Sequence, residues 1–430
     1  MEKILVRGGH PLCGCVEVSG SKNAALPIIY ACVLVRDKCI IENVPCVSDI
    51  RHSFDILRGI GARIRNLTKT TVEIDCTDVE CGVSEYSLVR QLRGSYYLLG
   101  AEFGRFGRSR VAYPGGCDFG VRPIDQHIKG FEALGGRVVT DAGYVEITSD
   151  TGRPRGASIY FDVSTVGATL NVMIAAATCE GMTVIENAAR EPHIVDCANF
   201  LNSCGARISG AGSDVIKIKG VERLHGTTYA IIPDMIEAGS YMAAAAATHG
   251  SVRVTNVIPK HLESIAAKLE EAGVVIDEFD DAVHVSAPRA LRHTNIKTLP
   301  YPGFPTDMHP QMCALLCGAE GTSFINESIF DNRFKYVEEL KRMGAKIKVD
   351  GRIVSIEGGN PLSAAPLMAV DLRGGIAVVI AALTCDGVSE ISGVNLIERG
   401  YDDAVGKLRG LGADIKKVFC PDPDIKKANA

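Results

Sequence analysis

The sequence Met343-Gly344-Ala345-Lys346-Ile347-Lys348-Val349 marks a structural repeat, because versions of it recur along the whole chain of 430 residues. A glycine in the left-handed conformation ends an amphipathic helix, and β-branched residues then resume an extended strand. The helix-ending glycines are Gly61, Gly135, Gly205, Gly273, Gly344 and Gly412. They lie 74, 70, 68, 71 and 68 residues apart. This spacing predicts six repeats of about 70 residues.

Each repeat also contains a second helix that is almost free of charged residues. These helices are expected at residues 24–31, 96–100, 168–173, 242–247, 311–315 and 376–380. A helix that is apolar on every side belongs in the interior of a domain. A β-rich run precedes the amphipathic helix and ends in Asn43, Asn187, Asn256 or Asn326 in four repeats. The pattern predicts two domains of three repeats, with sheets and amphipathic helices around a central bundle.

The composition argues for a globular protein with small partners. Lys and Arg number 46 against 51 Asp and Glu, so the net charge of −5 predicts neither a nucleic-acid binder nor a membrane-surface binder. No apolar run approaches the roughly 20 residues of a membrane span, and the first five residues lack the apolar core of a signal peptide. We therefore expect a cytoplasmic protein.

The sequence predicts no cofactor and no metal. Fifteen cysteines are scattered, most of them in apolar stretches such as the one around Cys32, where cysteine acts as a small hydrophobic residue. Neither a Cys-x-x-Cys pair nor a Cys/His cluster occurs, which argues against structural zinc. Glycine fingerprints of dinucleotide or P-loop sites are also missing.

Polar residues stand immediately before the charge-free helices. They are Lys22, Asn23, Arg93, Ser164, Thr165, Asp234, Glu237, Thr306, Asp307, Asp371 and Arg373. Ser164, Asp234 and Asp307 are equally suited to be ordinary N-caps. Lys22, Arg93 and Arg373, in contrast, oppose the helix dipole, and an anion bound by both the cation and the free N–H groups explains such a position. If the helices point alike, these groups gather at one end of each domain, and two such ends facing each other would form an anion-binding cleft.

The second repeat is expected to differ from the others. The glycine-rich loop at residues 114–123 stands where the other repeats have only a short link. Its Cys117 lies among polar and glycine residues, near Arg122, a setting in which a thiol is accessible and its pKa can be tuned. The alternative is a surface cysteine on a flexible loop. Residues 115–120 are predicted to close over the substrates as a lid.

Several segments closely resemble the family of UDP-N-acetylglucosamine 1-carboxyvinyltransferases, the enolpyruvyl transferases that open peptidoglycan precursor synthesis. The segments are SGSKNAALP at 19–27, PGGCDFGVRP at 114–123, ENAARE at 186–191, FPTDM at 304–308, FDNRF at 330–334, DLR at 371–373 and RGY at 399–401. The resemblance implies an α/β fold, a two-domain inside-out α/β barrel of six βαβαββ repeats. It places the first domain, with the Cys117 loop, at 22–233 and the second at 1–21 plus 234–430.

The resemblance also implies the reaction and its residues. The family transfers the enolpyruvyl group of phosphoenolpyruvate to the 3-hydroxyl of UDP-N-acetylglucosamine and releases phosphate. Cys117 would protonate C3 of phosphoenolpyruvate, could add to it covalently, and would make the enzyme sensitive to fosfomycin. Asp307 would accept the hydroxyl proton. The residues expected at phosphoenolpyruvate are Lys22, Arg122 and Arg399 on the phosphate side, Arg333 and Arg373 on the carboxylate side, and Asn23.

For the nucleotide sugar, the implied contacts come from four parts of the chain. They are Arg93, Arg122, Pro123, Ile124, Asp125, Gln126, Ser164, Thr165, Val166, Gly167, Asp307 and Ile329. The N–H groups at the helix start after Gly167 would cradle the diphosphate. The family pattern has a lysine in this segment, whereas this chain reads Val163-Ser164-Thr165 and lacks it.

Two other functions remain open. The sister enolpyruvyl transferase that acts on shikimate 3-phosphate shares the fold, but it expects Ser where Asn23 stands and lacks the cysteine loop. An inactive paralogue that only binds the ligands is a function of a different class. The presence of Lys22, Cys117, Arg122, Asp307, Arg373 and Arg399 together argues against it, and a turnover assay separates the two.

Overall fold

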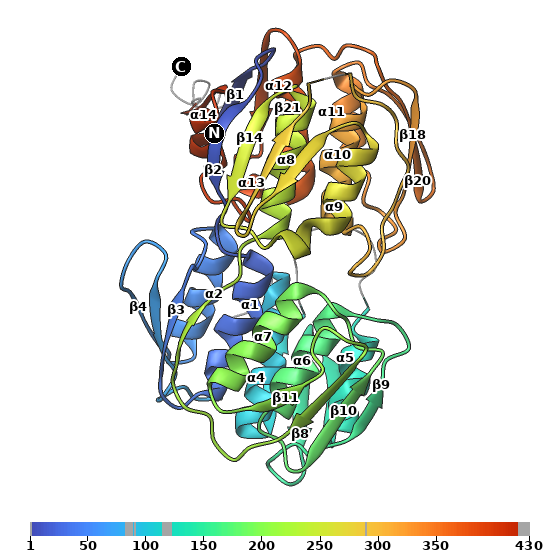
Figure 1. The fold of residues 1–430 in the computed structure, drawn as a ribbon. Helices are drawn as coiled ribbons and strands as arrows, with labels where there is room; N and C mark the ends of the chain where they lie inside the picture. The colour runs from blue at the N-terminus through green and yellow to red at the C-terminus, as the bar shows by residue number, and fades with distance from the viewer. Residues whose placement is uncertain (1, 82–88, 90–91, 114–122, 289, 420–430) are drawn as a thin grey trace, which may run out of the picture. The chain divides into compact units, whose positions relative to one another are not determined.

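The computed structural model describes residues 2–81, 89, 92–113, 123–288 and 290–419, which form two compact units. We call the described residues within 19–113 and 123–233 the first unit, and those within 2–18 and 234–419 the second unit. Each unit contains three repeats, as the spacing of the six glycines predicts (Figure 1).

A repeat consists of a central helix, a strand, an outer helix and a β-hairpin. In the first unit these elements are α1 (Lys22–Ala31), β3 (Lys38–Glu42), α2 (Ser48–Gly59), β4 (Arg63–Asn66) and β5 (Val72–Asp75); α4 (Tyr97–Phe106), β6 (Arg108–Ala112), α5 (Asp125–Ala133), β7 (Gly136–Asp141) and β8 (Tyr144–Ser149); and α6 (Val166–Ala176), β10 (Met182–Glu186), α7 (Pro192–Ser203), β11 (Arg207–Ser209) and β12 (Val215–Lys219).

The second unit follows the same order. Its elements are α8 (Met235–Ala247), β14 (Ser251–Thr255), α9 (Pro259–Glu271), β15 (Val275–Glu278) and β16 (Ala282–Ser286); α10 (His309–Leu316), β18 (Thr322–Asn326), α11 (Val337–Arg342), β19 (Lys346–Asp350) and β20 (Ile353–Glu357); and α12 (Leu372–Thr384), β22 (Val388–Ser392), α13 (Val394–Ile397), α14 (Ala404–Gly410) and β23 (Asp414–Phe419). Short 3₁₀ turns also occur: η1 (Cys32–Leu34), η2 (Arg93–Tyr96) and η3 (Thr306–Met308).

Five sheets gain a fourth strand that pairs in parallel with the strand after the central helix. These edge strands are β2 (Cys13–Glu17), β9 (Ser158–Tyr160), β13 (Thr228–Ala230), β17 (Ile296–Lys297) and β21 (Pro366–Met368). The sheet of the second repeat has the order β6-β8-β7 within the described residues. In β14, for example, Ser251 is opposite Cys13 in the parallel pair and opposite Ser286 in the antiparallel pair.

The chain exchanges strands where it passes from one unit to the other. β2 leads into α1 of the first unit but pairs with β14 of the second. β13 leads into α8 of the second unit but pairs with β3 of the first. The sixth repeat is completed by β1 (Glu2–Arg7), which lies between β22 and β23. The two connecting segments run antiparallel, since Ser21 N donates to Ile232 O at 2.8 Å.

All six glycines adopt the predicted left-handed conformation. Their φ angles lie between 83° and 100°. Each stands two residues beyond the last residue of an outer helix, as Gly205 does after α7. The local prediction of helix ends is therefore confirmed.

Three of the asparagines at the strand ends clamp the neighbouring edge strand. Asn43, Asn187 and Asn256 also have positive φ, between 55° and 56°. Their Nδ2 groups donate to the backbone oxygens of Ile231, Phe161 and Val18, which follow β13, β9 and β2. The same side-chain hydrogen bond thus joins the ends of the two parallel strands in three repeats.

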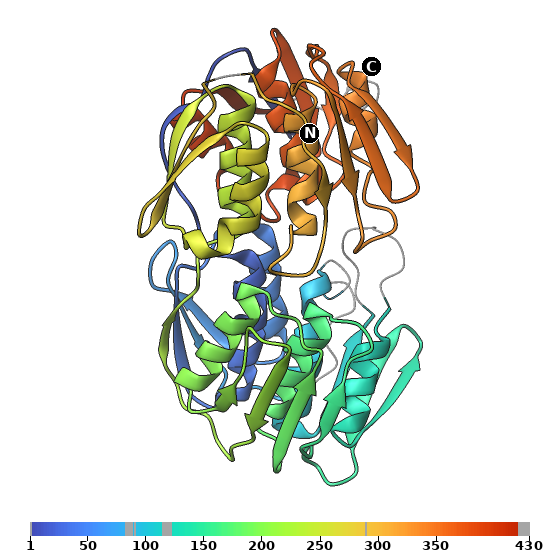
Figure 2. The same cartoon turned by 45° about the vertical axis from the view of Figure 1, so that its right-hand side comes forward.

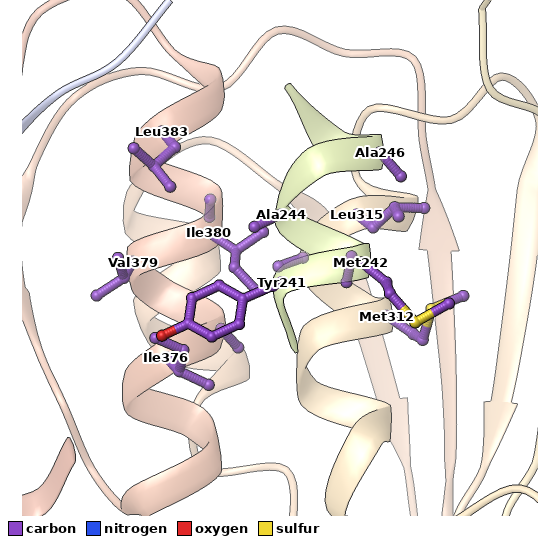
Figure 3. Close-up of a cluster of buried hydrophobic side chains, with 14 of the residues drawn as sticks. Tyr241, Met242, Ala244, Ala246, Met312, Leu315, Ile376, Val379, Ile380 and Leu383 are labelled. Carbon is purple, nitrogen blue, oxygen red and sulfur yellow. The ribbon is translucent and has the colours of Figure 1, made fainter. Parts of the chain in front are cut away.

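The central helices form the core of each unit. In the second unit α8, α10 and α12 pack together, and Figure 3 shows Met242, Met312 and Ile380 pointing into the space between them. All three are at most 1% exposed, so each contributes roughly 1.5–3 kcal/mol by burial. Figure 2 shows the sheets outside the helices from a second direction. This arrangement confirms the expected inside-out α/β fold.

Close helix contact in the first unit depends on a glycine. A Cβ atom on Gly100 of α4 would lie 2.4 Å from the backbone oxygen of Asn171 on α6. Gly100 N donates to Asn171 Oδ1 at 3.0 Å. Among the helices that the structure describes, none is long and apolar enough to cross a membrane.

A buried carboxyl in the first unit makes stability pH-dependent. Asp196 on α7 is 3% exposed, and burial raises its pKa to about 6, although hydrogen bonds from Tyr229 Oη and Ile232 N oppose the shift. A raised carboxyl pKa stabilises the folded protein below the unfolded-state pKa, and this stabilisation is lost as the pH rises through 6. The loss amounts to about 3 kcal/mol.

Asp196→Asn should remove this pH dependence. Chemical denaturation between pH 4 and pH 8 is expected to show a cost of the substitution that shrinks by up to about 3 kcal/mol as the pH rises. Asp214→Asn, at an exposed carboxylate paired with Arg190, is the control and should leave the pH profile unchanged. A constant difference between wild type and Asp196→Asn would contradict the prediction.

Candidate functional site

The starts of the three central helices of the second unit lie close together. Asp234 caps α8, and its side chain accepts from Ile236 N and Glu237 N. Asp307 lies in η3, directly before α10, and Arg373 is the second residue of α12. Arg373 interacts electrostatically with both carboxylates. The helices therefore point alike within this unit, and their starts gather at one end of it.

Two buried arginines hold the Asp307 carboxylate. Arg333 Nη2 donates to Oδ1 at 2.6 Å, and Arg373 Nε donates to Oδ2 at 3.1 Å. Arg333 and Arg373 are 3% and 1% exposed, whereas the Asp307 side chain keeps 27% of its surface. The alternative that Asp307 is an N-cap is wrong, because it lies within η3 and caps no helix. An oriented, partly accessible carboxylate results.

The Arg373 guanidinium has two donor atoms besides Nε, namely Nη1 and Nη2. Its Nη1 and Nη2 atoms are buried and make no hydrogen bond to any residue that the structure describes. Burial would lower its pKa, but Tyr401, Asp307 and Asp234 more than offset burial and raise it. The Tyr401 ring, 5.2 Å from the guanidinium carbon, is itself fixed by Ser240 Oγ at 2.8 Å. A fixed cation with two free, coplanar donors suits a carboxylate or a phosphate.

Arg333 comes from a long connection between a strand and an outer helix. Residues 327–336 join β18 to α11, so the expectation that the other repeats have only a short link is wrong for the fifth repeat. The guanidinium lies 5.1 Å from the Phe330 ring centre, and Nη1 donates to Thr306 Oγ1 at 2.7 Å. Ile329, in the same connection, is 37% exposed. Arg399 follows α13 and is partly buried.

In the first unit, Lys22 is placed at a helix start together with a buried carboxylate. Ser21 caps α1 by accepting from Ala24 N at 3.4 Å, and Lys22 is the first helical residue. Lys22 Nζ lies 3.5 Å from Oδ2 of Asp49, which is 2% exposed. Asn23 follows on the same turn and is partly buried. Asp49 thus fixes Lys22, the cation that the sequence predicts to bind an anion.

Arg93 begins η2, which runs directly into α4. Burial lowers its pKa, and its guanidinium lies 6.0 Å from the Tyr96 ring centre. The Tyr96 ring in turn lies 5.5 Å from the His127 ring. The predicted cation therefore stands beside two aromatic rings at the start of the second central helix.

No side chain caps the start of α6, the predicted diphosphate cradle. The N-cap is Thr165, which makes no side-chain cap bond, so the alternative of Ser164 as an ordinary N-cap is wrong. Ser164 is exposed, while Thr165, Val166 and Gly167 are partly buried. The first N–H groups of a helix have no partner within the helix. This end of α6 can therefore receive an anion.

His127 lies against that helix start. A Cβ atom on Gly167 would lie 2.9 Å from His127 Nε2, so only glycine fits there without displacing the ring. Asn171 Nδ2 lies 3.1 Å from His127 Nδ1, and Asn171 Oδ1 accepts from Gly100 N, which assigns the proton of the neutral ring to Nε2. Burial, followed by the charge of Arg93, lowers the His127 pKa to about 4. A neutral N–H donor therefore faces Gly167.

The segment before α5 has mixed exposure. Pro123 and Asp125 are exposed, whereas Ile124 and Gln126 are buried. Gln126 Nε2 donates to Asp125 Oδ2 at 2.8 Å, and its Oε1 accepts from Asp162 N at 3.0 Å. Gln126 thus connects the start of α5 to the end of β9.

Some predicted features lie outside the described residues. They are Cys117, Arg122, the remainder of the predicted lid and the end of the chain from residue 420. Nine of the thirteen described cysteines are buried, as expected for small hydrophobic residues, whereas Cys13 and Cys15 are exposed. Within the described part, no group of three or more His, Cys, Asp or Glu could hold a metal ion.

Sequence reasoning missed the buried partners of the predicted residues. Asp49 beside Lys22, His127 beside Gly167 and Glu327 beside Thr306 come from other parts of the chain. Their distance in sequence hides the pairing. For Glu327 the sequence offered one signal, its position directly after the predicted strand that ends at Asn326.

Comparisons with known proteins identify the family of this chain. The model of the family described as EPSP synthase (3-phosphoshikimate 1-carboxyvinyltransferase) matches residues 6–408. The UDP-N-acetylglucosamine 1-carboxyvinyltransferase 3 of Caldanaerobacter subterraneus is 50% identical over 418 residues, 97% of this chain and 100% of that protein. The UDP-N-acetylglucosamine 1-carboxyvinyltransferase of Clostridium botulinum is 51% identical over 419 residues, with coverage of 97% and 100%.

Solved structures give the same result. The enolpyruvyl transferase NikO from Streptomyces tendae has a TM-score of 0.87 at 25% identity and covers 98% of this chain and 99% of its own. The EPSP synthase of Acinetobacter baumannii shares the fold, with a TM-score of 0.77, 17% identity and coverage of 97% and 100%. Together with the six repeats, these matches show that the chain belongs to the EPSP synthase family of enolpyruvyl transferases and, within it, to the UDP-N-acetylglucosamine 1-carboxyvinyltransferases.

Proposed function

We propose that this chain transfers the enolpyruvyl group of phosphoenolpyruvate to the 3-hydroxyl of UDP-N-acetylglucosamine and releases phosphate, in the synthesis of peptidoglycan precursors. The observation that carries the proposal is the identity of 50% and 51% to relatives of that name along nearly their whole length. Shikimate 3-phosphate is the less favoured acceptor, because the EPSP synthase of Acinetobacter baumannii is only 17% identical.

The second unit offers a base and a cationic subsite. Asp307, held between two guanidinium groups, accepts the proton of the sugar hydroxyl as it attacks C2 of phosphoenolpyruvate. The free Nη atoms of Arg373 receive the carboxylate of phosphoenolpyruvate. Arg333 assists on this side, and Arg399 binds the phosphate.

The first unit offers anion-binding helix starts. Lys22 and Asn23 at the start of α1 bind phosphoenolpyruvate, with Arg122 on the phosphate. The free N–H groups of α6 and His127 Nε2 bind the diphosphate of the nucleotide sugar, which compensates for the lysine that the family has in this segment. The remaining nucleotide contacts are proposed for Arg93, Pro123, Ile124, Asp125, Gln126, Ser164, Thr165, Val166, Gly167 and Ile329.

The proposed reaction proceeds by addition and elimination. Cys117 protonates C3 of phosphoenolpyruvate, so that C2 becomes electrophilic and bonds to the sugar oxygen. The resulting tetrahedral adduct loses phosphate when C3 returns a proton, which restores the double bond. The two units correspond in this proposal to catalytic domains 22–233 and 1–21 plus 234–430. Fosfomycin sensitivity through Cys117 and a cytoplasmic location stay predictions.

Cys117→Ala should lower kcat by about 10²- to 10⁴-fold, the usual contribution of a general acid. The measurement is phosphate release from phosphoenolpyruvate with UDP-N-acetylglucosamine, with shikimate 3-phosphate as the comparison acceptor. Cys13→Ala, at an exposed cysteine on β2, is the matched control and should keep wild-type turnover. If folded wild type released no phosphate with either acceptor, a ligand-binding paralogue would be favoured instead.

A further inference from the structure

A buried carboxylate, Glu327, stands immediately behind the Asp307 site. Its side chain is fully buried at the end of β18. Both oxygens are used: Oε1 accepts from Ile329 N at 2.7 Å and from Phe330 N at 3.0 Å, and Oε2 accepts from Thr306 Oγ1 at 2.7 Å. A buried charge is costly unless it is hydrogen-bonded, and Glu327 has three donors.

The first link runs from Glu327 to Asp307. Thr306 Oγ1 donates its single proton to Glu327, so its lone pairs are available to Arg333 Nη1, which donates to it at 2.7 Å. The other Nη of Arg333 holds Asp307 Oδ1 at 2.6 Å. Glu327 therefore determines the direction of the Thr306 hydroxyl, and this hydroxyl fixes the guanidinium that orients Asp307.

A second link runs through the turn after β18. Glu327 holds the backbone of Ile329 and Phe330, and the Phe330 ring lies 5.1 Å from the Arg333 guanidinium carbon. One side chain thus fixes both a hydrogen-bond partner and a ring partner of Arg333. Ile329, 37% exposed, lies on this same turn.

The group packed behind Glu327 is a neutral histidine. His309 Nε2 lies 3.3 Å from Glu327 Oε2 without a hydrogen bond, and its Nδ1 lies 3.0 Å from Tyr336 Oη. Burial, followed by the charge of Arg333, lowers the His309 pKa. The positive charge nearest to Glu327 in this network is therefore that of Arg333, which reaches it through Thr306.

We propose that Glu327 is a positioning residue that sets the geometry of Asp307 through Thr306 and Arg333. The turn at Ile329 is held by its Oε1, an acceptor that glutamine also provides. The inference rests on the proposed function, in which Asp307 is the base. Glu327 itself does not touch the substrates. Its removal should therefore affect the rate of the chemical step more than the binding of the nucleotide sugar.

The test compares Glu327→Gln, Thr306→Val and Thr306→Ser. Gln keeps the shape of Glu327 but removes the negative acceptor of the Thr306 proton. Both Glu327→Gln and Thr306→Val are expected to lower kcat by about 10- to 100-fold, in line with the cost of small misalignments, with a KM for UDP-N-acetylglucosamine within about threefold of wild type. Thr306→Ser, which restores the hydroxyl, should recover kcat to within about threefold.

A double variant shows whether the residues act in one chain. Glu327→Gln combined with Thr306→Val should be no slower than the slower single variant, because the second change breaks a link that is already lost. The matched control is Glu102→Gln on α4, a fully buried carboxylate that accepts from Ser109 Oγ at 2.6 Å in the other unit. It tests general destabilisation and should keep kcat within about twofold of wild type.

The outcomes separate the two proposals. A kcat of Glu327→Gln within twofold of wild type, no recovery in Thr306→Ser, or fully multiplicative losses would each overturn the role of Glu327. Wild type without turnover would overturn the proposed function. The positioning role of Glu327 would then be tested by crystal structures of wild type and Glu327→Gln. In Glu327→Gln the Arg333 guanidinium should move by about 0.5 Å or more, and an unmoved guanidinium overturns the inference.

Discussion

Asp307→Asn is expected to lower kcat by about 10²- to 10⁴-fold. Asparagine has nearly the same shape, but its amide cannot accept the hydroxyl proton. Its NH₂ group would also face either Arg333 Nη2 or Arg373 Nε, so a donor would meet a donor on one side. The rate should fall while the KM for phosphoenolpyruvate changes much less, and single-turnover measurement of phosphate release checks this.

Asp331→Asn is the matched control for this prediction. Asp331 lies in the same connection after β18, but it is exposed and bonds to Arg352. Its substitution should leave kcat within about twofold of wild type. If Asp307→Asn retained more than a tenth of the wild-type rate, Asp307 would not be the base.

Arg373→Lys should raise the KM for phosphoenolpyruvate by about 10²- to 10⁴-fold, since two hydrogen bonds to a charged group are lost at about 1.5–3 kcal/mol each. The guanidinium holds Asp307 with Nε and still presents both Nη atoms. An ammonium group lacks this planar set of donors and cannot serve both directions at once. Lysine keeps the positive charge over the Tyr401 ring, so the variant tests geometry and not charge.

Arg409→Lys provides the comparison. Arg409 is exposed, donates through Nε and Nη2 to Ile415 O, and is not among the predicted site residues. Its substitution should leave the KM for phosphoenolpyruvate unchanged. An equally small effect of Arg373→Lys would exclude a bidentate contact at Arg373.

The fold was predictable because its signals are local and repeated. A glycine such as Gly344 ends an outer helix by its own backbone preference, and a charge-free helix such as α12 has to be buried, whatever its neighbours are. The sequence also predicted the cations at the helix starts. It did not predict the capping pattern at Ser164 and Asp307, because a 3₁₀ turn or an uncapped start differs from a capped helix by only a few backbone bonds.

The supporting shell of the site was not predictable in the same way. Glu327 contacts Thr306 across 21 residues, and Asp49 contacts Lys22 across 27. Such pairs depend on which strand ends and helix starts meet in three dimensions, and no local preference encodes that. A buried Glu and a surface Glu look alike in a single sequence.

The strand exchange sets the order in which the chain can fold during synthesis. β1 leaves the ribosome first, yet its partners β22 and β23 are made last. At about 5–20 residues per second, β1 waits roughly 20–80 s for them. Likewise β3 lacks its parallel neighbour until β13 has been made. The nascent protein therefore carries unpaired, apolar strand edges for most of its synthesis, a period in which it is open to aggregation and to chaperones.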